Sequence, residues 1–146
     1  MNRDELLERE SEAWSDFEAV ILGVPPERRA VEGVVPGWST HDLVWHCVYW
    51  VADVADALER LGRGAAEPEE PDDDALVAEI LAQGRQMTWD EALERAEPSR
   101  ERARAALSAL ADVPETAVVL FAGETFDHYE EHRGEISAFG ERRDGN

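Results

Sequence analysis

Cysteine, long apolar runs and basic residues are all scarce in this sequence. Cys47 is the only cysteine, so no disulfide can form within the chain, as is usual in a reducing cytoplasm. No apolar run approaches the roughly 18 residues that a membrane-spanning helix requires. The segment from Met1 to Glu10 also lacks the apolar stretch of a signal peptide. We therefore expect a cytoplasmic protein.

The shortage of basic residues bears on possible partners. The chain has 14 basic against 34 acidic residues, which gives a formal net charge of −20. Nucleic acids and anionic lipids are bound through lysine and arginine, so neither a nucleic-acid nor a membrane partner is expected. A small-molecule substrate stays compatible with this charge. The length of 146 residues suits one domain, spanning 1–146.

What the sequence does contain is helical periodicity with clear start signals. Asn2, Ser39 and Thr88 can each cap a helix, and Asp42 and Glu91 complete capping boxes behind the last two. The apolar spacing predicts helices over about 3–22, 40–61, 89–111 and 124–142, and a short one over about 75–83. The fold class expected is all-α, a four-helix bundle with one short extra helix.

Three local features qualify this pattern. Pro98 predicts a kink or a break within the third long helix. The apolar run from Ala117 to Phe121 is too short to assign by periodicity, and we interpret it as a lead-in to the last helix. The acidic stretch from Glu67 to Asp74 is typical of a solvated loop.

Chemistry is indicated first by two histidines in the last helix. His128 and His132 are four residues apart, so they lie one turn apart on the same face and could bind one metal ion. Such pairs also occur by chance, and two histidines alone bind metal weakly. His46, on the face of the second helix that also carries Trp50 and Asp53, is the best candidate for a third ligand. Three ligands leave a position open, which is typical of a catalytic site.

Other residues of these segments have competing interpretations. His41 falls in the first turn of a helix, where the dipole disfavours positive charge, so we expect a surface or capping-region residue that binds no metal. The motif from His128 to His132 also matches an inverted zinc-peptidase motif with Glu131 as the base, but such enzymes are generally larger. Cys47 lies on the core stripe, which favours a buried apolar role over a thiol donor.

Two segments together resemble a known family. Gly37, Trp38, Ser39, Asp42 and His46 match the opening of the second helix in DinB-like (damage-inducible) proteins. His128, His132 and Ile136 match the His-x-x-x-His-x-x-x-Ile pattern of the family's last helix. The order and separation of the segments also match.

The resemblance implies a function as well as a fold. DinB-like proteins, with the related YfiT-like proteins and mycothiol-dependent maleylpyruvate isomerases, are four-helix bundles in which three histidines bind a divalent metal, commonly zinc or nickel. The ligand positions fall on His46, His128 and His132. Characterised relatives include thiol-dependent transferases or isomerases and hydrolases of small molecules, and homodimers are common. Gly134, in the middle of the last helix, departs from the pattern.

Two chemical routes stay open at this point. A bound metal could activate water for attack on an electrophile, or bind the thiol of a low-molecular-weight cofactor. Trp45, Trp50 and Trp89 could line a pocket, although core positions are favoured for them. Glu131 and Asp53 are possible bases, although solvated carboxylates are the default. The rival hypothesis is a non-catalytic bundle, a dimer or binding module whose histidines bind metal for stability or not at all.

Overall fold

The computed structural model describes residues 1–65 and 73–144. Its helices are α1 (Arg3–Leu22), α2 (Thr40–Gly62), α3 (Asp73–Arg85), α4 (Trp89–Glu94), α5 (Ala96–Ala109), α6 (Glu115–Glu124) and α7 (Phe126–Asp144), with a 3-10 turn η1 (Pro26–Arg28). No strand occurs within these two ranges. Of the predicted acidic loop, residues 67–72 lie outside the described ranges.

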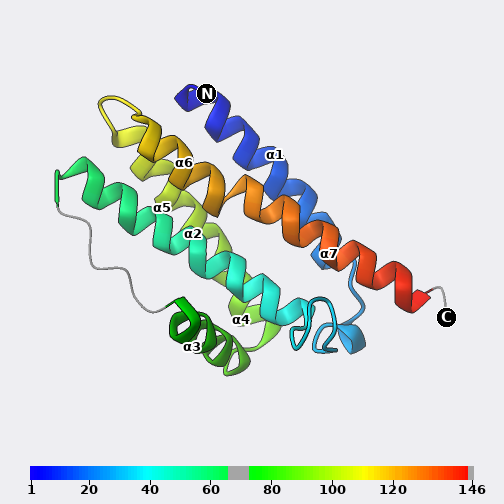
Figure 1. Ribbon diagram of the computed structural model, residues 1–146. Helices are drawn as coiled ribbons and strands as arrows, with labels where there is room; N and C mark the ends of the chain where they lie inside the picture. Colours follow the sequence, from blue (N-terminus) through cyan, green and yellow to red (C-terminus); the bar gives the residue numbers. More distant parts are fainter. Residues whose placement is uncertain (66–72, 145–146) are drawn as a thin grey trace.

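The long helices form an elongated bundle (Figure 1). Its four rods are α1, α2, the pair α4–α5 and the pair α6–α7. Helix α2 packs mainly against α5, and α1 packs mainly against α7. The short helix α3 lies outside the bundle and contacts α2. The predicted fold class, a four-helix bundle with one short extra helix, is confirmed.

The start signals of the helices act as the sequence predicts. The Ser39 side chain accepts from the backbone N–H of Asp42, and the Asp42 carboxylate accepts from the N–H of Ser39 at 2.9 Å. Thr88 and Glu91 form the same reciprocal box at α4. Because Ser39 and Asp42 fix the first turn of α2, they also set the direction in which His46 projects, two turns later.

Two expectations about helix ends need correction. The break near Pro98 falls earlier, after Glu94, because the proline ring clashes with the carbonyl four residues before it. Pro98 itself lies in the first turn of α5, where a missing N–H costs little. The run from Ala117 to Phe121 is not a lead-in: it is part of helix α6, and the last helix begins at Phe126, not Glu124.

The junction between α6 and α7 is a sharp local break. Thr125 has φ −117° and ψ −98°, outside the helical region, and its hydroxyl donates to the carbonyl of Phe121 at 2.7 Å. The two helices therefore form one rod with a bend just before His128. Among the described residues, none of the helices is both long and apolar enough to span a membrane.

Candidate metal centre

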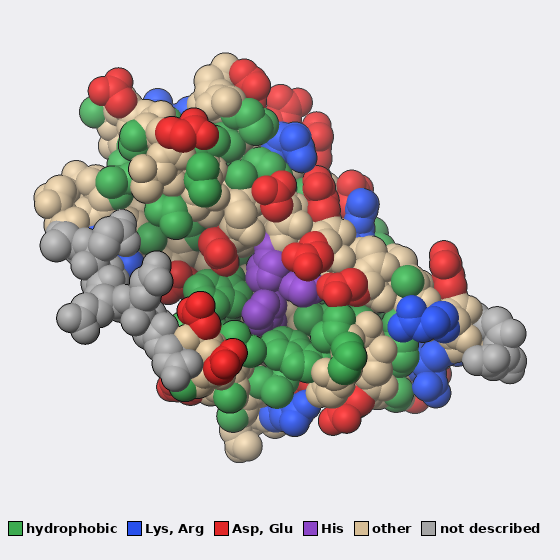
Figure 2. Space-filling model, viewed as in Figure 1, with side chains coloured by type: hydrophobic (Ala, Val, Ile, Leu, Met, Phe, Trp, Pro, Cys, Tyr) green, Lys and Arg blue, Asp and Glu red, His purple; other side chains and the backbone are tan. Residues whose placement is uncertain are grey.

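The three predicted histidines meet between α2 and α7. The ring centroids of His46 and His128 are 4.8 Å apart, those of His46 and His132 5.4 Å, and those of His128 and His132 4.5 Å. One nitrogen of each ring lies within 4.8 Å of the others. Nitrogens around one tetrahedral zinc ion stand about 3.4 Å apart, so small ring rotations would bring all three onto one ion. Figure 2 shows the imidazoles at the surface, between carboxylates and apolar side chains.

The hydrogen bonding of these rings is incomplete in a way that fits a metal. The Nδ1 atoms of His46 and His128 are buried and have no hydrogen-bond partner among the residues that the structure describes. Nδ1 of His132 is instead paired with the carboxylate of Glu135, one turn further along α7. A carboxylate on the far nitrogen orients a ligating imidazole and makes it more basic. This arrangement leaves Nε2 of His132 as the nitrogen that could ligate a metal.

The electrostatics keep two of the rings neutral. Burial, together with the charge of His132, lowers the pKa of His46 from 6.5 to about 4. Burial and the charges of His132 and His46 lower the pKa of His128 to about 3. Histidine must be neutral to ligate a metal, so at neutral pH both rings are in the ligating form.

Aromatic side chains surround His46. Trp38 meets its ring edge-on at 5.2 Å, and Trp50 does so at 6.3 Å from the next turn of α2. Tyr49 stacks edge-on against Trp50 at 5.4 Å. Trp38 was not singled out as a site residue from the sequence. The sequence held one signal for this role: Trp38 comes immediately before the helix cap Ser39, and a side chain at that position packs back against the first turns of the helix.

Of the other candidate residues, only Trp50 contacts the histidine cluster among those compared here. His41 stays outside the cluster: its Nε2 is 2.8 Å from the carbonyl oxygen of Gly84. Cys47 is fully buried, and burial followed by the nearby carboxylates raises its pKa well above the usual value, so the expected core role is supported. Trp45 and Trp89 are buried, and of the three tryptophans considered only Trp50 contacts His46. Glu131 is exposed.

A second buried polar cluster lies on the α1 side of α7. Glu10, 1% exposed, accepts two bonds from Arg100 at 2.7 and 2.8 Å and a third from Arg104 at 3.0 Å. The Tyr129 hydroxyl donates to the same carboxylate at 3.0 Å. Because Tyr129 stands next to His128, this network fixes how α7 is rotated and helps aim its histidines at α2. Local sequence patterns do not reveal this network, since the partners of Glu10 are 90 or more residues away from it in the chain.

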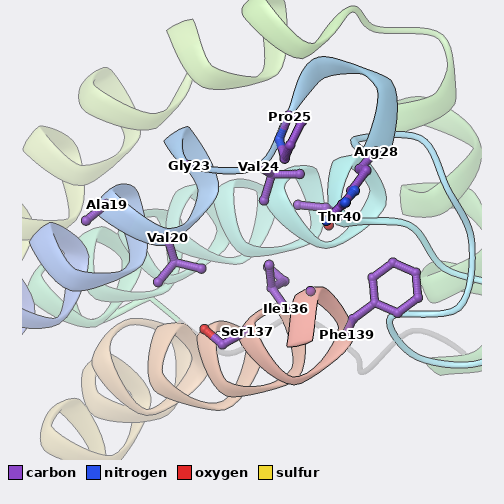
Figure 3. Close-up of a pocket in the computed structure, with 11 residues that line it drawn as sticks. Ala19, Val20, Gly23, Val24, Pro25, Arg28, Thr40, Ile136, Ser137 and Phe139 are labelled. Atoms are coloured by element: carbon purple, nitrogen blue, oxygen red, sulfur yellow. The ribbon is translucent and has the colours of Figure 1, made fainter. Parts of the chain in front are cut away.

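A cavity of about 280 Å³ lies between the end of α1 and the second half of α7, and it is separate from the histidines. Figure 3 shows Val20, Val24, Ile136 and Phe139 around this space. Among the described residues, those that line it include no histidine and no carboxylate. The three-histidine cluster on α2 and α7 therefore lies outside this cavity.

Fold and site together define a helical-bundle protein with a three-histidine cluster that could hold a divalent metal. The chain belongs to the DinB superfamily, whose sequence model matches residues 11–136. A structure with the same fold is that of an uncharacterised protein from Escherichia coli UTI89, with a TM-score of 0.81. The two are 14% identical, over 98% of this chain and 95% of that one. A comparison with curated proteins gives no match.

Proposed function

We propose that this protein is a metal-dependent enzyme that acts on a small molecule, with a divalent ion held by His46, His128 and His132. The observation that carries the proposal is the convergence of three imidazoles whose nitrogens lie within 4.8 Å, two of them with a buried Nδ1 that has no partner. Buried polar groups without partners are rare in native proteins, and a bound ligand is a common reason for them. Zinc and nickel both suit imidazole ligands.

The surrounding residues have distinct parts in this proposal. His46 and His128 supply neutral nitrogen ligands, and Glu135 holds His132 in the orientation that presents Nε2. Trp38 and Trp50 shield one side of His46 from water. A bound divalent ion supplies Lewis acidity, which makes a water molecule or a thiol a stronger nucleophile near neutral pH. The reaction is then either thiol-dependent transfer or isomerisation, with a low-molecular-weight thiol as cofactor, or hydrolysis.

Metal analysis of matched variants tests the binding site. Protein purified without an affinity tag is expected to hold about one ion per chain, and His128→Ala and His132→Ala about 0.1 or less. His41→Ala is the matched control, because it removes a histidine outside the cluster and should keep the ion. Equal metal content in all four proteins would remove the basis of the proposal.

Activity assays then separate the two reactions. The metal-loaded protein is incubated with electrophiles, with and without low-molecular-weight thiols, and thiol consumption and acid release are followed. Thiol consumption that a chelator abolishes supports the transferase, and metal-dependent hydrolysis without thiol supports the hydrolase. A full metal complement with no turnover on either panel would favour the non-catalytic bundle.

A further inference from the structure

The cavity between α1 and α7 has apolar walls and one polar end. Its volume of about 280 Å³ is close to the roughly 300 Å³ at which small-molecule sites begin. Val20 and Ile136 belong to the apolar part of the lining. In Figure 3, Arg28 and Thr40 lie at the end of the space where the ring of Phe139 stands. A ligand that matches this cavity has an apolar body and one polar head group.

The polar end holds a buried hydroxyl group that has no partner. Thr40 is 1% exposed and lines the cavity. Within residues 1–65 and 73–144, its hydroxyl makes no hydrogen bond. Buried hydroxyl groups are normally paired in native proteins, so this one requires a partner that the cavity itself supplies.

The backbone of the same residue adds a second unused donor. Thr40 is the first residue of α2, and the capping box uses the N–H groups of Ser39 and Asp42. The N–H of His41 donates to the carbonyl of Arg29 at 2.9 Å. Among the described residues, the N–H of Thr40 has no such acceptor. Free N–H groups at the start of a long helix attract anions.

The charges around this end of the cavity are positive. Among the residues that the structure describes, Arg28 is the one charged side chain in the lining. The guanidinium groups of Arg142 and Arg143 lie 5.6 and 5.7 Å from the centre of the Phe139 ring, which is part of the wall. The whole chain has a net charge of −20, but the screening length is about 8 Å at physiological salt, so these nearby cations count for more than distant carboxylates. The head group that this end favours is therefore an anion.

We propose that the cavity between α1 and α7 binds a small carboxylic acid with an apolar chain. The carboxylate contacts Thr40 and Arg28, because a guanidinium beside further donors suits a planar anion with two oxygens. The chain lies against Val20, Val24 and Ile136. This site is separate from the three histidines, so the proposal depends neither on a bound metal nor on the proposed enzyme activity.

Three ligands separate the contribution of the head group from that of the chain. Protein labelled with ¹⁵N is titrated with octanoate, octan-1-ol and acetate, and the amide chemical shifts give both the affinity and the location. We expect saturable binding of octanoate, with the largest shift changes around Thr40 and Ile136, and about tenfold weaker binding of the alcohol. Acetate lacks the chain and should bind at least about a hundredfold more weakly. The affinity for octanoate should be the same with zinc as with a chelator.

Single substitutions at the polar end test the two contacts. Thr40→Val keeps the shape of the side chain and should weaken octanoate about fivefold, without lowering the thermal stability of the ligand-free protein, because the lost hydroxyl has no partner. Arg28→Gln should weaken octanoate about tenfold. Arg63→Gln is the matched control, because it removes the same charge from an exposed position at the opposite end of α2 and should leave the affinity unchanged.

Several results would overturn the proposal. Octanoate that fails to bind, or binds no more tightly than octan-1-ol, would show that the cavity has no site for a carboxylate. Shift changes centred on the histidines, and seen only with zinc, would place the ligand on the metal instead. Unchanged affinity in both Thr40→Val and Arg28→Gln, or an equal loss in Arg63→Gln, would show that the polar end does not hold the head group.

Discussion

Helix α7 contributes to two polar clusters of opposite character, one fully buried and one half-buried. On one side, Tyr129 joins the charged group of Glu10 and Arg100, in which the carboxylate accepts four hydrogen bonds. On the other side, His128 joins a cluster of imidazoles with two buried nitrogens that have no partner. A saturated network stabilises one arrangement of the helices, whereas an unsaturated one is arranged for a ligand. Adjacent residues of one helix thus serve stability and binding separately.

The largest effect on stability is expected from removing the carboxylate of the Glu10 network. Glu10→Gln keeps the size of the side chain but leaves Arg100 and Arg104 without their carboxylate, which should cost about 3 kcal/mol or more of unfolding free energy. Urea unfolding of the variant measures this loss. Glu8→Gln removes the same charge from an exposed position of α1 and should change stability little. Equal effects of the two substitutions would mean that the network contributes no more than net charge.

The second-largest effect is expected from metal binding to the histidine cluster. Zinc at 100 times its dissociation constant should stabilise the protein by about 2.7 kcal/mol, provided that the unfolded chain does not bind it. His128→Leu should abolish this gain and leave the metal-free stability nearly unchanged, because it removes a buried nitrogen that has no partner. Thermal unfolding with zinc and with a chelator gives both quantities. A zinc effect that persists in His128→Leu contradicts the assignment.

Lowering the pH should destabilise the metal-free protein through the histidine cluster. The folded pKa values of His46 and His128, about 4 and about 3, lie below the unfolded value of 6.5. Between these limits the unfolded chain binds more protons, so the metal-free protein should lose stability as the pH falls from about 7 to 4. Urea unfolding at pH 7.5 and pH 5 measures the loss. It should be smaller in His128→Leu, and an equal loss in that variant would assign the pH dependence to other groups.

The smallest effect concerns the helix that supports both clusters. Gly134 is exposed on α7, and an added Cβ would meet nothing within 4 Å. Gly134→Ala should therefore raise stability by about 0.5–1 kcal/mol, since it removes only the entropic cost of glycine. Gly84→Ala is the contrasting variant, because its Cβ would fall 2.6 Å from Cδ1 of Trp45. Thermal unfolding should move in opposite directions for the two, and a gain in both would contradict the packing around Gly84.

The sequence predicted what depends on local rules. Capping boxes and apolar spacing located α2 and the short α3, and the four-residue spacing of His128 and His132 placed both on one face. Glu135 and Trp38 were missed, because their roles depend on how the rings are rotated. The Glu10 network was also missed, since its partners come from three helices far apart in the chain. The start of α7 was misplaced because the Thr125 break lies inside a continuous helical pattern.

The indoles beside His46 have a practical consequence. Trp38 and Trp50 lie 5.2 and 6.3 Å from its ring. Paramagnetic ions such as Cu²⁺ and Ni²⁺ quench tryptophan fluorescence at such distances, whereas Zn²⁺ has a filled d shell and does not quench in this way. Tryptophan fluorescence would therefore distinguish a bound paramagnetic ion from bound zinc without an added label. The emission that remains after quenching would come from the indoles farther from His46.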